Sequence, residues 1–396
     1  MKLYSKKKFY KHTLLFCMFL STIFFIFVSI FCINKSHAHE QLILSHKQLI
    51  ILSNYMYLDD CATLMPIKDK LESYKTNNKY DKSCISLPAS GIKDSQMIEM
   101  FKEIEKDSLL LNLVPVAYIE TDIRAVCFVP SSNVGKEHAE AVLVFLGTKA
   151  LNNAWLDCLE GSYYEDTLLQ LEALDFYNTV SEFYNITTIT GHSKGGNLAQ
   201  YVTITGKDSI RNCVSFNGQG FSNMFINKYN QKIANNVDKI TSVVSYKEPV
   251  NTLLNPIANN TLIINTDNNV DTLSSHVSSY LYNSSFFDEN GNYLPSAFTT
   301  RTTAITTFDN ICDKLVNNLD AKYLKYVSQK SAPILGTLIP ILQDAMARED
   351  VSLLRGFIYE INKRIEQSNN NKLTENDITY LENTLYNSAN YSVVAR

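Results

Sequence analysis

The sequence predicts an α/β fold with a mainly parallel β-sheet and helices on both faces of that sheet. Two observations indicate this class. Short runs rich in β-branched residues alternate with helical stretches, and one of these runs, residues 141–146, is apolar throughout, as in a strand buried on both faces. The expected strands are residues 123–130, 141–146, 186–190, 213–217, 240–246 and 261–266.

Helices are expected before and between these strands. Residues 95–113 place Met97, Ile98, Phe101 and Ile104 at helical spacing. With 396 residues, 45% of them hydrophobic, the chain can build a large core. In an open parallel sheet, ligands bind beyond the carboxyl ends of the strands. The other helices expected in this part of the chain are residues 40–60, 167–184, 197–202 and 224–234.

The chain changes character near residue 300, where a second helical region begins. We therefore divide the protein into an export segment at residues 1–38, an α/β domain at residues 39–298 and a helical region at residues 299–396. The sequence leaves three roles open for the last region: a cap that limits substrates, a partner-binding module, or packing on the preceding domain. Its expected helices are residues 303–319, 335–347, 351–367 and 375–387.

Residues 191–196 read Gly-His-Ser-Lys-Gly-Gly and directly follow the expected strand 186–190. A Gly-x-Ser-x-Gly pattern between a strand and a helix is typical of a nucleophile elbow, the sharp turn that presents the serine of an α/β-hydrolase. Glycine suits so crowded a turn because it has no Cβ. The helix that follows directs unpaired N–H groups toward Ser193. We therefore expect an α/β-hydrolase fold with Ser193 as the nucleophile.

A serine nucleophile needs a base and an acid, which follow it in the order acid, then histidine, in this fold. His276 is the one histidine after Ser193, and it lies in a loop beyond an expected strand. Glu248 follows the end of the strand 240–246 and is the preferred acid. Asp267 and Asp271 also lie between the serine and the histidine and remain alternatives.

Two backbone N–H groups are candidates for an oxyanion hole. One belongs to Lys194, the residue after the nucleophile. The other belongs to Thr148, because the buried strand 141–146 ends in Gly147-Thr148. The cysteines and histidines show no spacing typical of zinc, so we expect no metal and no other cofactor.

These motifs resemble those of class 3 (fungal-type) lipases. Residues 191–201 resemble the elbow, and are most similar to that of an uncharacterised bacterial lipase-like family in which Lys follows the serine. Phe145-Leu146-Gly147-Thr148 resembles the oxyanion segment, and Glu248-Pro249-Val250 resembles the acid segment. The resemblance covers about residues 45–285. Leu146 replaces the usual arginine, and Glu248 replaces the usual aspartate.

The resemblance implies a lipid substrate, with acylglycerols or phospholipids as the class. In lipases the segment that corresponds to residues 149–166 contributes to a lid. Trp155 is the candidate acyl or lid contact there, and packing in the core or at its rim is the alternative. The expected function is an exported serine hydrolase of carboxylic esters, a lipase or phospholipase. The alternatives are a non-catalytic binding protein of the same fold, or a thioesterase or acyltransferase that uses the same triad.

The N-terminus predicts export. Five lysines precede an apolar run at residues 13–33, and the small residues Ser36 and Ala38 suit a signal peptidase site. Cleavage after Ala38 is the preferred interpretation, and an uncleaved anchor at residues 13–33 is the alternative. Removal of residues 1–38, which hold six lysines and no acidic residue, changes the net charge from −4 to −10. An acidic protein of this kind is not expected to bind nucleic acid, and any transient membrane contact would be apolar.

Six cysteines lie outside the export segment. Cys61 and Cys84 flank a polar loop and form the one disulfide that the sequence suggests. Cys127 and Cys213 lie in apolar strands and are expected to be buried free thiols.

Overall fold

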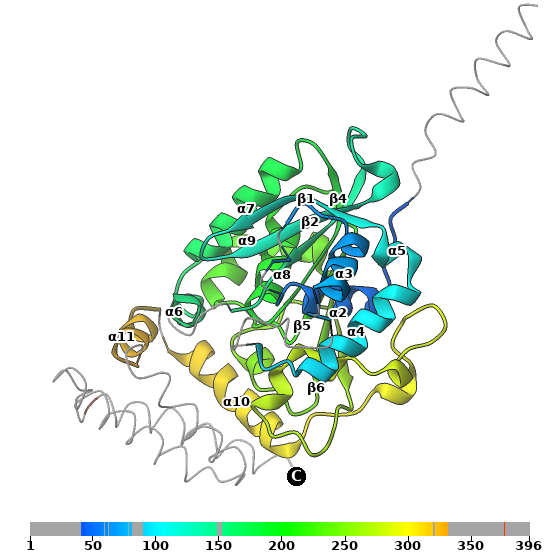
Figure 1. The fold of residues 1–396 in the computed structure, drawn as a ribbon. Helices are drawn as coiled ribbons and strands as arrows, with labels where there is room; N and C mark the ends of the chain where they lie inside the picture. Colours follow the sequence, from blue (N-terminus) through cyan, green and yellow to red (C-terminus); the bar gives the residue numbers. More distant parts are fainter. Residues whose placement is uncertain are drawn as a thin grey trace, which may run out of the picture. The chain divides into compact units, whose positions relative to one another are not determined.

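The computed structural model describes residues 41–58, 60–61, 63–77, 79–80, 90–148, 153–319, 321–331 and Asn376. From Leu42 onward these residues belong to one compact unit (Figure 1). The predicted export segment, Cys84 and, apart from Asn376, the expected helices beyond Ser331 lie outside the described residues. No helix among the described residues is long and apolar enough to cross a membrane.

A seven-stranded sheet forms the centre of the described residues, and its strands lie side by side in sequence order. The first three strands are antiparallel, and from the third strand onward every neighbouring pair is parallel. The strands are β1 (Leu113–Glu120), β2 (Arg124–Pro130), β3 (Glu140–Phe145), β4 (Asn185–His192), β5 (Asn212–Phe216), β6 (Ile240–Ser245) and β7 (Asn260–Ile264).

Helices cover both faces of this sheet, and each face has its own apolar core. Along β3, Val142 and Val144 pack toward α2, α3 and α4, whereas Leu143 and Phe145 pack toward α7, α8 and α9. The alternation follows from the pleat of a strand, which points successive side chains to opposite faces. The helices are α2 (His46–Tyr55), α3 (Ile67–Thr76), α4 (Asp94–Lys106), α5 (Ser108–Leu111), α6 (Asn153–Glu160), α7 (Leu168–Val180), α8 (Lys194–Thr205), α9 (Asn223–Asn236), α10 (Thr303–Asn318) and α11 (Ala321–Ser331).

The arrangement of the helices follows from the strand order. Right-handed crossovers between sequential parallel strands place all their helices on one face, here the face of α7, α8 and α9. The other face would expose apolar strand residues, and the N-terminal helices α2 to α5 cover it (Figure 1). The prediction of a mainly parallel sheet with helices on both faces is confirmed, and the fold is that of an α/β-hydrolase.

One predicted helix is wrong in part. Residues 95–113 form two helices, because Asp107 ends α4 and begins α5. Its carboxylate accepts hydrogen bonds from the N–H groups of Leu109 and Leu110, as an N-cap residue does. The chain then enters β1, a strand that the sequence pattern did not predict. Ser45 and Thr167 are the N-caps of α2 and α7, and each forms a capping box with a glutamine three residues later.

The described part of the helical region packs on the loop after β6. Ile305 and Phe308 of α10 contact Leu253. The Arg301 guanidinium donates to the Glu248 carbonyl (3.4 Å) and to Asn251 Oδ1 (2.5 Å). These contacts favour packing on the α/β domain as one role of this region.

The cysteines differ in part from expectation. Cys61 is a buried free thiol that donates to the Met56 carbonyl. The suggested disulfide between Cys61 and Cys84 is therefore wrong, because Cys61 is not part of a disulfide. The Arg124 guanidinium lies 3.6 Å from its sulfur. Cys127 and Cys213 are buried free thiols, as predicted.

Candidate active site

Ser193 occupies the turn between β4 and α8. It has φ 56° and ψ −123°, a backbone conformation that non-glycine residues rarely adopt. Such strain persists only where the surroundings over-determine it, and it is typical of nucleophile elbows. Its N–H donates to the Phe216 carbonyl of β5 (2.9 Å), which ties the turn to the sheet.

The glycines of the elbow are required by close backbone contacts. A Cβ on Gly191 would lie 2.5 Å from the carbonyl carbon of Gly195. A Cβ on Gly195 would lie 2.6 Å from the Leu146 carbonyl oxygen, beyond the end of β3. The elbow is therefore packed against the end of β3 as well as against its own first helical turn.

Ser193, His276 and Glu248 lie in one hydrogen-bonded chain. The Ser193 Oγ lies 2.8 Å from His276 Nε2, and His276 Nδ1 lies 2.8 Å from Glu248 Oε1. A carboxylate only accepts, so Nδ1 carries the proton and Nε2 is free to accept the serine proton. Ser193 is 9% exposed, the His276 side chain 19% and Glu248 not at all, so the acid end of the chain is fully shielded from solvent while the serine and the histidine keep limited access to it.

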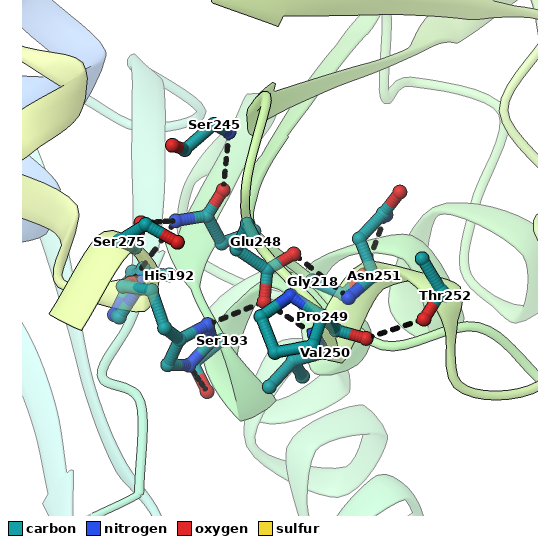
Figure 2. A network of polar contacts seen from close by, with 12 residues as sticks. His192, Ser193, Gly218, Ser245, Glu248, Pro249, Val250, Asn251, Thr252 and Ser275 are labelled. Carbon is teal, nitrogen blue, oxygen red and sulfur yellow. Dashed lines mark hydrogen bonds and ion pairs between the residues drawn. The ribbon is translucent and has the colours of Figure 1, made fainter. Parts of the chain in front are cut away.

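Glu248 is held by the turn that follows it. Its carboxylate accepts hydrogen bonds from the N–H groups of Val250 (2.5 Å) and Asn251 (2.8 Å), as Figure 2 shows. By contrast, Asp267 accepts from the Asn269 N–H, and Asp271 accepts from its own loop at Leu273 and Ser274. The geometry therefore brings Glu248, of the three sequence candidates, to the histidine.

His276 lies in a short 3-10 turn (Ser274–His276) within an irregular segment after β7. Its carbonyl accepts from His192 Nε2 (2.7 Å) and from the Asn217 side-chain amide (3.0 Å). Two residues later, the Ser278 hydroxyl donates to Asn54 in α2 (2.6 Å). Side chains from three other elements thus hold the loop that carries the histidine.

His192 is a site residue that the sequence analysis missed. Its ring is buried, and Nδ1 lies 2.6 Å from the Tyr57 hydroxyl. Burial, and after it the proximity of His276, lower the pKa of His192 well below its ordinary value, although the hydrogen bond to the His276 carbonyl opposes this shift, so the ring is neutral. His192 occupies the first variable position of the Gly-x-Ser-x-Gly pattern, where the pattern accepts any residue, so the motif could not predict this role.

Of the two predicted oxyanion donors, Lys194 directly follows Ser193, and Thr148 follows a strand end that packs on the elbow. Lys194 is the first residue of α8, where backbone N–H groups lack partners inside the helix. A Cβ on Gly147 would lie 2.9 Å from the His192 carbonyl oxygen, so the end of β3 packs directly on the elbow. Thr148 follows Gly147 and is half-buried there.

The Lys194 side chain points away from Ser193 into a buried polar cluster. Its ammonium forms an ion pair with Asp157 of α6 and donates to Asn197 (3.0 Å). Asp157 also accepts from the Thr167 hydroxyl (3.0 Å). No sequence motif indicated this pair. Trp155 belongs to α6, and its side chain lies outside the described part of the structure.

No group of three or more histidine, cysteine, aspartate or glutamate side chains suited to a metal ion occurs among the described residues. The chemistry that the Ser193–His276–Glu248 chain suits is nucleophilic attack by an activated serine.

The fold and this hydrogen-bonded chain define the class: an α/β-hydrolase-fold protein with a Ser–His–Glu arrangement. The model of the Mbeg1-like family matches residues 118–319, which hold all three residues. The chain belongs to the Mbeg1-like family, a lipase-like family, and the expected lipase-like resemblance is confirmed at that level. The bacterial subgroup stays a prediction.

Among solved structures, the chain is similar to one described as the crystal structure of M37 lipase. The two are 13% identical, the match covers 54% of this chain and 70% of that chain, and the TM-score is 0.28. A search of curated proteins found no match.

Proposed function

We propose that this protein is a lipase-type serine hydrolase that cleaves carboxylic esters. The observation that carries the proposal is the continuous chain from Ser193 Oγ through the His276 ring to Glu248, with both contacts at 2.8 Å. A nucleophile, a base and an orienting acid within hydrogen-bond reach are the arrangement that activates a serine hydroxyl.

The reaction follows from the three roles. Ser193 Oγ attacks the ester carbonyl carbon while His276 Nε2 takes the hydroxyl proton, and Glu248 stabilises the imidazolium. The N–H groups of Lys194 and Thr148 bind the oxyanion of the tetrahedral intermediate. The intermediate collapses as His276 returns the proton to the leaving alkoxide, which departs as the alcohol. Water, activated by His276, then attacks the acyl-enzyme and releases the acid.

Membership of a lipase-like family supports acylglycerols or phospholipids as substrates. We also propose that the protein is exported and that its signal peptide is cleaved after Ala38. In the alternative, residues 13–33 stay uncleaved and anchor the protein in the membrane. Membrane contact would then be transient and apolar, and nucleic acid is not a partner. Mass spectrometry of protein recovered from outside the cell tests this directly, since cleavage leaves His39 as the first residue.

Labelling with a fluorophosphonate probe tests the chemistry. Purified protein should react at Ser193, whereas Ser193→Ala and His276→Ala should lose labelling and ester hydrolysis by about 10⁴-fold or more. Glu248→Gln should also lose most activity, while Asp267→Asn and Asp271→Asn should stay near wild type. Equal labelling of wild type and both alanine variants would contradict the proposal and favour a non-catalytic binding protein.

A panel of esters and thioesters then defines the substrate. Short-chain and long-chain acyl esters separate an esterase from a lipase. A preference for thioesters, or transfer of the acyl group to an added alcohol rather than to water, would instead identify a thioesterase or an acyltransferase.

A further inference from the structure

A second hydrogen-bonded chain lies behind the proposed triad. It runs from the Tyr57 hydroxyl to His192 Nδ1 (2.6 Å), and from His192 Nε2 to the His276 carbonyl oxygen (2.7 Å). Tyr57 and His192 are each 3% exposed, so water does not compete for these bonds. Tyr57 follows α2 and precedes residues 118–319, the part that matches the family model.

The donors and acceptors in this chain allow one assignment for a neutral ring. A carbonyl oxygen only accepts, so the proton of His192 must be on Nε2. Nδ1 is then an acceptor, and the Tyr57 hydroxyl must donate to it. The tyrosine thus selects the tautomer in which His192 donates to the backbone of His276.

We propose that His192 and Tyr57 are positioning residues that hold His276 in line with Ser193. The proposal rests on the proposed function of the Ser193–His276–Glu248 chain. His192 is both the neighbour of the nucleophile in sequence and a hydrogen-bond donor to the base. It therefore couples the position of the His276 backbone to the elbow itself.

The loop of His276 needs such a contact because it has little regular structure of its own. His276 lies in a three-residue 3-10 turn, and its carbonyl is held by His192 and Asn217. Proton transfer in a serine hydrolase requires the base within about 3 Å of the hydroxyl, and an error of about 1 Å can cost about 100-fold in rate.

The charge state of His192 also suits this position. Its ring centroid lies 4.9 Å from that of His276, so a charged His192 would oppose the imidazolium that forms during catalysis. Two titratable groups face the His192 ring: Tyr57, which follows α2, and His276. Glu248 lies on the far side of His276. The Lys194 ammonium is directed away, to Asp157.

Three variants test the proposal. His192→Gln keeps one donor and one acceptor, Tyr57→Phe removes only the hydroxyl that sets the tautomer, and His192→Leu removes all hydrogen bonding. With a soluble short-chain ester, we expect kcat to fall about 100-fold in His192→Leu and about 10-fold in Tyr57→Phe. His192→Gln should stay within about 5-fold of wild type, and KM should change less than about 2-fold in all three.

A merely structural role would not give this pattern, because rescue by glutamine and a selective loss of kcat require the hydrogen bonds. His46→Gln is the matched control, since this half-buried ring packs on Tyr293 at the other end of α2 and should leave kcat unchanged. Wild-type kcat in both Tyr57→Phe and a folded His192→Leu would overturn the proposal. So would a folded His192→Gln that is no better than His192→Leu, or a loss seen in KM alone.

Failure of the proposed function gives a different result. In that case the wild-type protein neither hydrolyses the ester nor reacts with the fluorophosphonate, and the positioning role falls with it. If the wild type reacts but the variants match it, the serine hydrolase stands and only the positioning role is lost. Circular dichroism and thermal unfolding of each variant identify any that fails to fold, and Tyr57→Phe remains a test if His192→Leu does.

Discussion

The nucleophile and the base of this site are held in place in two different ways. Ser193 is placed by regular structure next to it in the chain: β4 ends one residue before it, and α8 begins one residue after it. His276 lies in an irregular segment and is held by side chains 28, 59 and 84 residues away, those of Glu248, Asn217 and His192.

Because of this difference, we expect substitutions at the elbow to lower both stability and activity, and substitutions around the His276 loop to act mainly on activity. Contacts of the elbow belong to the buried core of the sheet, so damage there should unfold the protein as well as inactivate it. Contacts of the His276 loop are individual hydrogen bonds, each with a net contribution of about 1 kcal/mol. Their loss should reduce the rate while leaving the protein folded.

The largest expected effect is on the buried ion pair beneath the elbow. The Lys194 and Asp157 side chains are 3% and 5% exposed, so Asp157→Ala leaves a buried ammonium without its counter-charge. We expect the free energy of unfolding to fall by about 3–5 kcal/mol. Urea denaturation measures it, with the exposed Asp175→Ala as the control. Recovery in the double variant Lys194→Met, Asp157→Leu would support the electrostatic cause, and a loss below 1 kcal/mol in Asp157→Ala would contradict it.

The second-largest effect is expected for Gly195→Ala, which tests how tightly the elbow is packed. Its Cβ would meet the Leu146 carbonyl at 2.6 Å, and backbone on both sides resists the shift that would relieve it. We expect a loss of about 1–3 kcal/mol in stability together with a loss of kcat. Gly135→Ala is the comparison, because the new Cβ would lie in open space. Only the positive φ of this residue, 79°, is unfavourable for alanine. It should cost about 1 kcal/mol with kcat unchanged. Equal behaviour of the two variants would refute the packing argument.

Asn217→Gly tests the loop of the base. Asn217 has φ 48°, which glycine adopts freely, so this variant removes the side chain without straining the backbone. The His276 carbonyl and the Ser245 N–H each lose one hydrogen bond. We expect kcat to fall about 10-fold and stability to fall by about 1–2 kcal/mol. An unchanged kcat in a variant of lower stability would show that the loop keeps His276 in place without Asn217.

The smallest effect is the pH dependence that His192 adds to stability. Burial and the nearby His276 lower its pKa in the folded state, whereas the unfolded residue titrates near 6.5. The unfolded chain therefore binds the extra proton as the pH falls below 6.5, and this contribution to stability decreases by at most about 1.4 kcal/mol per pH unit. His192→Gln lacks the titrating group. Urea midpoints between pH 7.5 and 5 should fall more steeply for the wild type, and parallel curves would contradict a neutral buried ring.

Much of the architecture was predictable because its signals are local. The central strands are short runs rich in β-branched and apolar residues, and the elbow is a short motif with strict backbone demands, so both follow from neighbouring residues. The missed strand β1 has no such signal. It is an edge strand that contains Pro115, its pairing shifts register between Pro115 and Ala117, and it is partly exposed. A proline and a bulge are tolerated at an edge, but they obscure the pattern.

By itself the sequence determined six of the seven described strands and the turn at Ser193, because each depends on residues close together in the chain, and the order of serine, acid and histidine can be read directly along the chain. Only the tertiary structure decided which of three acids meets His276, because Asp267 and Asp271 bind their own loops while Glu248 reaches the ring. It also decided that Tyr57 meets His192 across 135 residues. Such contacts depend on how the N-terminal helices pack on the sheet, and no local pattern encodes that packing.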